Sequence, residues 1–204
     1  MSLETVMKMI LLLAFVFSTV VNAQQRWTDN QYDNQIGPSD KATTPTCFQT
    51  TPSFSPDSVG PFHIGISVEQ VETLCHSLRF GWYGGDEGIF EPVALLKFGS
   101  GSILLEFDDT LITSRVRRMF IGTPEIRSPE GLGVGSLVKD LAAKWGKPSR
   151  AEIECLLYVY FKSKPGISFQ VDLPVQRDCG QLENVDEAIL SQSKVRQVLI
   201  IAKR

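Results

Sequence analysis

The sequence predicts an α+β fold built from two tandem units, each a helix followed by a three-stranded antiparallel meander. Three observations lead to this prediction. Ser114–Ile121 reads SRVRRMFI, and Ser193–Ile200 nearly repeats it as SKVRQVLI. Apolar residues at helical spacing precede each copy, and short strand-like runs lie between the helix and the copy. A repeat of roughly 70 to 80 residues is too long for a solenoid, so two tandem units explain it; the alternative is a chance match between short apolar strands.

The first 23 residues have the features of a secretory signal peptide. Lys8 precedes the apolar run Met9–Val21, and Asn22-Ala23 supplies a small-residue cleavage site. The run is shorter than the roughly 20 residues that a membrane span needs, although a retained anchor helix is the alternative. We therefore expect a periplasmic or secreted protein with no membrane span after cleavage. Residues 24–57, rich in Asn, Gln, Ser, Thr and Pro, are expected to form a flexible polar leader.

Export also predicts disulfides, because oxidised cysteines persist outside the cytoplasm. The four cysteines are Cys47, Cys75, Cys155 and Cys179. Three pairings are possible, and we favour Cys47–Cys75 with Cys155–Cys179 because each half of the chain then has its own bridge. A zinc site at the first pair, with His63 and His76, is the alternative, but neither C-x-x-C nor H-x-x-x-H spacing occurs. We therefore expect no metal and no cofactor.

The first unit is expected over residues 58–125. Its helix has Ser67 as N-cap and Gln70 three residues later, which is the spacing of a capping box. The apolar residues at helical spacing are Val68, Val71, Cys75 and Leu78. A glycine-rich loop or hairpin, FGWYGGDEGIF, comes next. It is followed by the strand-like runs PVALLKF, SILLEFDD and RVRRMFIG, with GSGS as a tight turn between the first two.

The second unit is expected over residues 126–204. Ser136 is the expected N-cap of its helix, the apolar stripe runs from Leu137 to Trp145, and Gly146 ends the helix. The strand-like runs LLYVYF, GISFQVD and KVRQVLIIA follow, with KSKPG as a turn. The two units align in order. The helices are offset by 70 residues, the middle strands by 64, and the last strands, which carry SRVRRMFI and SKVRQVLI, by 79.

The motif EGLGVGSLVKDLAAKWG, followed by a meander, resembles the helix-plus-meander unit of the β-lactamase-inhibitory-protein-like folds. Small outer-membrane-assembly lipoproteins carry one such unit, and β-lactamase inhibitory proteins carry two in tandem, each with its own disulfide. The resemblance covers about residues 58–204. It implies one long antiparallel sheet, helices over one face, and a concave face that is free to bind a protein. No residue pattern carries over lactamase inhibition itself.

Two features are candidates for a binding site. Trp82 and Tyr83 stand in the glycine-rich loop, and large aromatic residues anchor many interfaces; the alternative is that one of them packs onto the core. Arg117 and Arg196 take corresponding positions in the repeated strand, so they would place basic residues on one sheet face. Such a strip could meet an acidic partner, or it could be an ordinary solvated face. We expect binding through these four residues.

No arrangement typical of catalysis stands out. GLGVGS precedes a helix but lacks the spacing of nucleotide-binding loops, and no G-x-S-x-G elbow accompanies the two histidines. Asp86-Glu87 and Asp108-Asp109 are paired acids of the kind that serve glycosidases or hold calcium. The formal net charge of −3 argues against nucleic acid as the partner.

The expected function is therefore an exported, non-enzymatic binding module of the inhibitor or envelope-assembly type. Its expected partner is another exported or envelope protein, bound through the sheet face and the glycine-rich aromatic loop. The alternative is a small carbohydrate-binding protein or hydrolase that uses the loop carboxylates Asp86 and Glu87.

Overall fold

The structure is a computed structural model that describes residues 47–76, 78–84, 90–153, 155–173 and 180–202. The expected signal peptide and the leader up to residue 46 lie outside these residues. The described elements, in chain order, are β1 (Phe54–Ser55), β2 (Ser58–Val59), β3 (Phe62–His63), α2 (Val68–Leu74), β4 (Arg79–Gly84), β5 (Phe90–Phe98), β6 (Gly101–Phe107), β7 (Val116–Ile121), α3 (Val138–Trp145), β8 (Ser149–Ile153), β9 (Leu156–Tyr160), β10 (Ile167–Asp172), the 3-10 helix η1 (Leu182–Asn184), α4 (Glu187–Gln192) and β11 (Lys194–Ile201).

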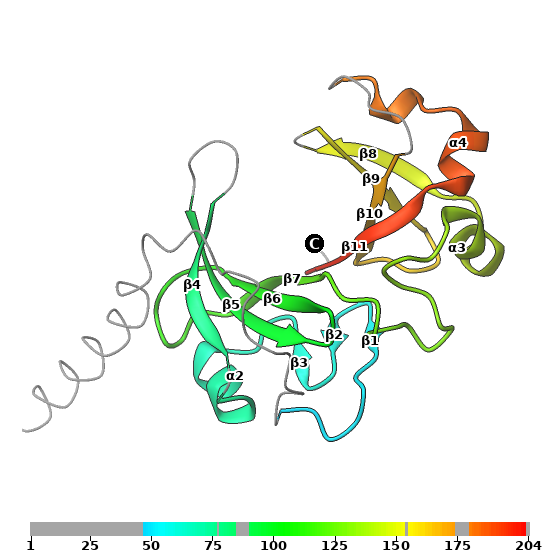
Figure 1. The fold of residues 1–204 in the computed structure, drawn as a ribbon. Coiled ribbons are helices and arrows are strands. Elements are labelled where there is room, and N and C mark those ends of the chain that lie inside the picture. The colour runs from blue at the N-terminus through cyan, green and yellow to red at the C-terminus, as the bar shows by residue number, and fades with distance from the viewer. Residues whose placement is uncertain (1–46, 77, 85–89, 154, 174–179, 203–204) are drawn as a thin grey trace, which may run out of the picture.

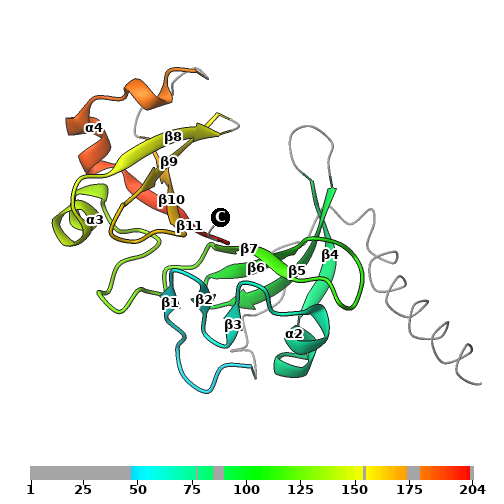
Figure 2. The same ribbon diagram turned by 180° about the vertical axis from the view of Figure 1, so that it is seen from behind.

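Within the described residues, eight strands form one antiparallel sheet, called here the main sheet (Figures 1 and 2). Its strand order is β4-β5-β6-β7-β11-β10-β9-β8. The strands β4 to β7 are therefore its first half, the strands β8 to β11 its second half, and β7 pairs with β11 in the middle. The protein is a mixed helix and sheet fold, as expected.

In the described part of the chain, each half of the main sheet has four strands rather than the expected three. The additional strands are β4 and β8. The glycines of RFGWYG favoured a loop, but Phe80 and Trp82 of β4 pack against the core and hold the segment in the sheet. Strand β8 lacks apolar alternation, because Arg150 and Glu152 occupy positions opposite the core residues of β9.

The first helix begins as predicted and the second does not. Ser67 and Gln70 form the capping box of α2, each side chain accepting from the other residue's backbone amide. The N-cap of α3 is Leu137, without a side-chain cap, so the prediction of Ser136 was wrong. The Ser136 hydroxyl instead accepts from the amide of Gly133 (3.1 Å) and from Arg127 (3.1 Å), which fixes the loop before the helix. Gly146 ends α3 with φ +89°, as predicted.

The two faces of the main sheet have different surroundings. Side chains alternate along a strand, and one set joins the continuous core that also contains Val68 and Val71 of α2 and Leu141 and Trp145 of α3. Figures 1 and 2 show the sheet bent between its halves, with the helices on the outside of the bend. The core face is called the outer face below, and the opposite face the inner face.

The second half of the sheet carries additional cover on its outer face. The long loop expected before the last strand contains η1 and α4, and Asp186 caps α4 by accepting from the amide of Ala188 (2.7 Å). Arg150 of β8 donates to the carbonyl of Val185 (2.6 Å), and Glu152 accepts from the amide of Leu182 (3.0 Å). These polar contacts explain why β8 is a strand without apolar alternation.

The last part of the expected leader belongs to the folded protein. Phe48 and Phe54 are buried in the core, and β1 lies in this segment as the first strand of a small sheet, β1-β2-β3. The amide of Phe54 donates to the carbonyl of Arg127 (3.1 Å), in the connection between the halves. This segment therefore helps to hold the two halves together.

The tight turn between β5 and β6 is as predicted, and Glu125 supports it. The Glu125 carboxylate accepts from the hydroxyl of the buried Thr123 and from the backbone amide of Ser100 (3.0 Å). The hydrogen bond from Thr123, together with those from Ser100, overcomes the effect of burial and lowers the pKa of Glu125 to about 2.

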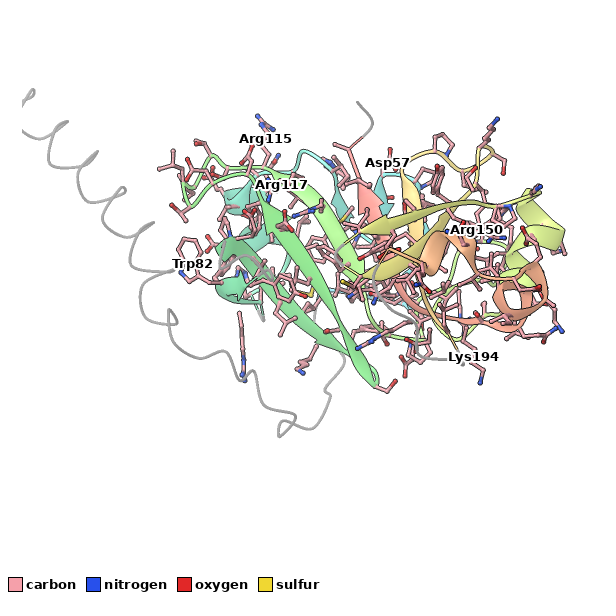
Figure 3. The ribbon with its side chains drawn as sticks, turned by 90° about the horizontal axis from the view of Figure 1, so that it is seen from above. Asp57, Trp82, Arg115, Arg117, Arg150 and Lys194 are labelled. Carbon is pink, nitrogen blue, oxygen red and sulfur yellow. A yellow bond between two sulfur atoms is a disulfide. The ribbon has the colours of Figure 1, made fainter. Side chains whose placement is uncertain are left out.

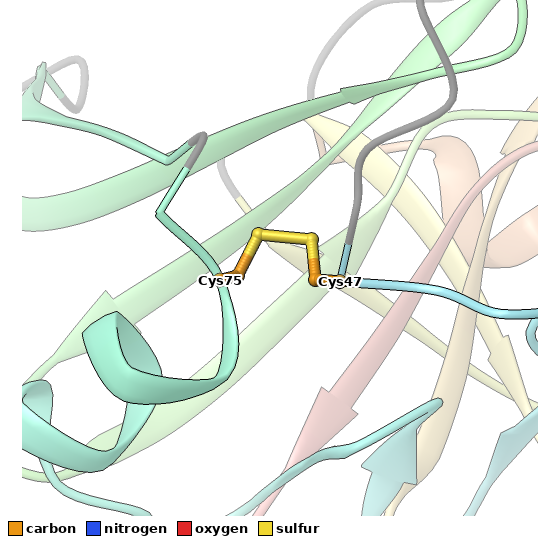
Figure 4. The surroundings of a disulfide bond; sticks show 2 residues. All are labelled: Cys47 and Cys75. Carbon is orange, nitrogen blue, oxygen red and sulfur yellow. A yellow bond between two sulfur atoms is a disulfide. The ribbon is translucent and has the colours of Figure 1, made fainter.

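One predicted disulfide is confirmed. Cys47 and Cys75 are bonded, and the bridge joins the start of the described chain to the residue that ends α2 (Figure 4). Cys155 is also disulfide-bonded, and its expected partner, Cys179, lies outside the described residues. Among the helices that the structure describes, none is long and apolar enough to cross a membrane.

Candidate functional site

The inner face of the main sheet carries the features that the core does not explain. The strand registers define its members, since residues paired across antiparallel strands share a face. Those used below are Arg79, Tyr83, Glu91, Val93, Leu95, Lys97, Glu106, Arg118 and Phe120 in the first half and Tyr160, Gln170 and Leu199 in the second.

The inner face combines a buried apolar centre with exposed aromatic and aliphatic side chains. Val93, Leu95 and Leu199 are buried, although none of them belongs to the core cluster of the outer face. Tyr83 near one end of the sheet is 52% exposed, and Tyr160 in the second half is 38% exposed. The exposed tyrosines, rather than the centre that is already buried, are the side chains of this face that a partner can contact.

A β-bulge places two consecutive arginines beside one carboxylate. The register between β6 and β7 shifts after Glu106, so that Arg117 and Arg118 both lie opposite this residue. Arg118 Nε donates to both oxygens of Glu106 at 2.8 and 2.9 Å, and Arg117 Nε donates to Oε1. The Glu106 side chain is only 1% exposed, whereas the two arginines are 39% and 38% exposed. A buried carboxylate thus holds two partly exposed guanidinium groups.

Glu91 of β5 completes this charged cluster. Its Oε1 lies 2.6 Å from Nη2 of Arg117, and its side chain is 29% exposed. Burial on its own lowers the pKa of Arg117, but the charges and hydrogen bonds of Glu106 and Glu91 outweigh burial and raise that pKa above its ordinary value. Arg117 therefore stays charged at every physiological pH.

Aromatic rings continue the cluster toward the middle of the sheet. The guanidinium of Arg118 lies over the Phe120 ring, 5.8 Å from its centroid, which is a cation–π geometry. The Tyr83 ring lies 6.4 Å from the ring of Phe120. Charged and aromatic groups of β4, β5, β6 and β7 are therefore contiguous on the first half of the inner face.

The structure separates the aromatic pair that the sequence analysis singled out. Trp82 and Tyr83 are consecutive residues of β4, so their side chains lie on opposite faces. Trp82 packs against the core on the outer face, and Figure 3 shows it at the margin of the first half. Tyr83 lies on the inner face, opposite Glu91 of β5. Only Tyr83 belongs to the surface described above.

The two arginines that were predicted to act together lie far apart. Arg117 is next to Arg118, which pairs with Ile201 of β11, whereas Arg196 is near the start of β11. The carbonyl of Arg117 accepts from the amide of Ala202 (3.3 Å), which is six residues beyond Arg196 along the extended chain, or about 20 Å. Figure 3 shows Arg117 and Lys194, the first residue of β11, toward opposite ends of the molecule. Arg196 is 64% exposed and lies 3.7 Å from Asp172.

Sequence reasoning missed Glu106, Arg118 and Phe120. Glu106 was visible as the one charged residue inside the apolar run ILLEF. No sequence pattern indicated that Glu106 is buried on the face away from the helices. None indicated the bulge that brings Arg118 beside Arg117.

The other candidate sites have structural explanations or lie outside the described residues. Asp86 and Glu87 are outside them. Asp108 accepts from the amide of Arg115 (2.8 Å), and Asp109 from that of Thr110 (2.6 Å), so both acids stabilise a turn. In the part of the chain that the structure describes, no group of three or more His, Cys, Asp or Glu side chains is placed to hold a metal ion.

Comparison with known proteins supports the fold alone. A scan against protein-family models found no match, and a search of curated proteins found none either. Among solved structures, the chain is similar to the uncharacterized protein YfeY of Escherichia coli, with a TM-score of 0.56 and 18% identity over 74% of this chain and 99% of that one. At this identity the likeness shows a shared fold. The resemblance to β-lactamase inhibitory proteins stays a prediction.

Proposed function

We propose that the protein is a non-enzymatic binding module that binds another protein on the inner face of its main sheet. The observation that carries this proposal is the inner face itself. It holds exposed aromatic side chains such as Tyr83 and Tyr160, and two partly exposed arginines positioned by a buried carboxylate. Interface anchors are typically aromatic residues and arginine, and positioned side chains lose little entropy on binding.

We also propose that the two halves are tandem copies of one unit, as the repeated sequence predicts. Matching contacts support this. The amide of Gly65 donates to the carbonyl of Val116 (2.8 Å) before the first helix, and that of Gly135 donates to the carbonyl of Val195 (2.7 Å) before the second. The bulge after Glu106 has a counterpart after Gln170. Both correspondences follow the offsets of 70, 79 and 64 residues found in the sequence.

The proposed location is the periplasm or the exterior of the cell. The Cys47–Cys75 bridge and the disulfide of Cys155 support it, because such bonds persist in oxidising compartments. The signal peptide predicted for residues 1–23 agrees with them. The partner is then another exported or envelope protein.

The proposal is tested by capture followed by mapping. The chain from Gln24 to Arg204 is immobilised and exposed to periplasmic and secreted extracts, beside a Tyr83→Ala/Tyr160→Ala variant and the control Leu74→Ala. Leu74 is 42% exposed on α2, away from the inner face. Leu74→Ala therefore removes a side chain about as exposed as the two tyrosines, but from a different surface. A captured protein is then identified, produced in pure form and titrated.

The expected result is a dissociation constant that rises at least 10-fold in the tyrosine variant and is unchanged in the control. Hydrogen exchange of the complex is expected to slow in β5, β6 and β7. Equal binding by all three proteins, or slowed exchange confined to the helices, contradicts the proposal. Binding of glycans in place of any protein favours the carbohydrate alternative.

A further inference from the structure

We propose that Arg117 and Arg118 receive a carboxylate from an acidic segment of the partner protein, and that Glu91 occupies this place in the unbound chain. The inference deepens the proposed function and rests on it, because it names the chemistry that the inner face recognises. It is carried by the different environments of the two glutamates that contact the arginines.

Glu106 positions the arginines and is not available for exchange. Its side chain is 1% exposed, and it accepts from Nε of both arginines. These contacts use the Nε side of each guanidinium. Within the described residues, the Nη1 group of each arginine donates no hydrogen bond, while the side chains remain 39% and 38% exposed. The two Nη1 groups, together with the Nη2 group of Arg117 once Glu91 leaves it, are therefore the oriented donors for the incoming carboxylate.

Glu91, in contrast, is placed to be exchanged. It is 29% exposed, and within the described residues its ion-pair partner is Arg117, through Nη2 at 2.6 Å. An ion pair near the surface contributes little to stability, because water competes for both charges. A carboxylate from a partner, bound by two guanidinium groups and shielded from water by the interface, gains more than this. Replacing Glu91 by that carboxylate is therefore favourable once the partner covers the site.

The charge of the surrounding surface selects an acidic partner. On the described inner face of the first half, Arg79, Lys97, Arg117 and Arg118 are basic, and Glu91 and Glu106 are acidic. This excess of positive charge lies on a chain whose formal net charge is −3. Phe120 and Tyr83 border the arginines. The site thus fits an acidic side chain flanked by apolar ones, as a protein segment provides.

The two glutamates also provide the test. Changing either Glu91 or Glu106 to glutamine removes one negative charge. If binding depended on net charge alone, both variants would bind an acidic ligand more tightly than the parent protein. The exchange described here predicts opposite effects: Glu91→Gln tightens binding about 3- to 5-fold because the competitor is removed, and Glu106→Gln weakens it at least as much because the arginines lose their orientation.

The probe is a capped hexapeptide with two adjacent glutamates between valines, compared with the same peptide carrying glutamines. The full chain, labelled with nitrogen-15 arginine, is titrated to millimolar peptide while the Nε–H signals are followed by NMR. Arg196→Gln serves as the control, since Arg196 takes the matching position at the bulge of β11. Urea unfolding confirms that each variant is folded at the temperature of the titration.

The expected result is a saturable shift of the Arg117 and Arg118 signals with the acidic peptide only, with opposite effects of the two glutamate variants and none of Arg196→Gln. No shift at millimolar peptide, equal shifts with both peptides, or tighter binding by both glutamate variants overturns the inference. A captured partner that depends on Tyr83 and Tyr160 but binds both glutamate variants equally well leaves the proposed function intact and removes this refinement.

Discussion

Removing both arginine partners of the buried Glu106 carboxylate is expected to destabilise the protein far more than removing the carboxylate itself. The double change Arg117→Gln/Arg118→Gln leaves a carboxylate that is 1% exposed without its charged partners. Removing the partners of a buried charge costs about 3 to 5 kcal/mol. The change Glu106→Gln instead leaves two arginines that are more than a third exposed and can turn to water. It loses charge-assisted hydrogen bonds and costs about 1 to 2 kcal/mol.

The triple change Glu106→Gln/Arg117→Gln/Arg118→Gln isolates the cause. If the stranded charge is responsible, adding Glu106→Gln to the double variant recovers at least about 2 kcal/mol of its loss. Urea unfolding at pH 7, followed by tryptophan fluorescence, measures these differences. With a slope of about 2 kcal/mol per molar urea, the double variant moves the midpoint by about 2 M.

A matched control comes from the second half of the sheet. Arg196→Gln alters the corresponding bulge, where the paired residue is the neutral Gln170, and is expected to cost less than about 0.5 kcal/mol. If Glu106→Gln proved as destabilising as the double arginine change, or if the triple variant were the least stable, the reasoning from the buried charge would be wrong.

Three further predictions concern stability. Changing Cys47 and Cys75 to serine removes a bridge between residues 28 positions apart, and the loop-closure relation gives a loss of about 3 to 4 kcal/mol in urea unfolding; a variant as stable as the parent contradicts this. Gly101→Ala brings a Cβ onto the carbonyl oxygen of Gly122, the residue after β7, and is expected to cost about 1 to 3 kcal/mol. Gly122→Ala meets only an ordinary contact at 3.7 Å and is the control, expected to lower the thermal midpoint much less. The pKa of Glu125 is lowered in the folded protein to about 2 from 4.5, so its carboxylate stabilises the fold above pH 4.5 and this contribution disappears as the pH falls toward 2. Glu125→Gln should therefore lower the urea midpoint at pH 7 and leave it unchanged at pH 2; because the side chain is exposed, the difference stays below about 1 kcal/mol.

Helices α2 and α3 and six strands of the main sheet could be predicted because their signals are local. The capping box of Ser67 and Gln70 and the end of α3 at Gly146 need only a few neighbouring residues. Strands β5, β6, β7, β9, β10 and β11 carry enough apolar residues to be recognised from their own sequence. Strand β8 does not, because its polar side chains contact a loop that follows much later in the chain. Such a strand becomes recognisable only when its cover is known.

The candidate site could be predicted only in part, for a geometric reason. Arg117 and Tyr83 were found from residue type, and they lie on the same face of the sheet. Period-2 alternation assumes an unbroken register, and the bulge after Glu106 breaks it, so that Arg118 lies beside Arg117. The same alternation, applied to β4, separates Trp82 from Tyr83 once that segment is known to be a strand.

The pairing of β7 with β11 has a consequence for biosynthesis. Strand β7 ends at Ile121, but the strand that pairs with its second edge begins only at Lys194, after α3 and three further strands. While the chain is emerging, the first half therefore presents an open strand edge with no partner, which is the kind of edge that recruits strands from other chains. Charged side chains on such a strand discourage this pairing, and β7 carries Arg117 and Arg118. In addition to binding a partner, these arginines can therefore protect the newly made first half of the chain from aggregation until β11 is synthesised and pairs with β7.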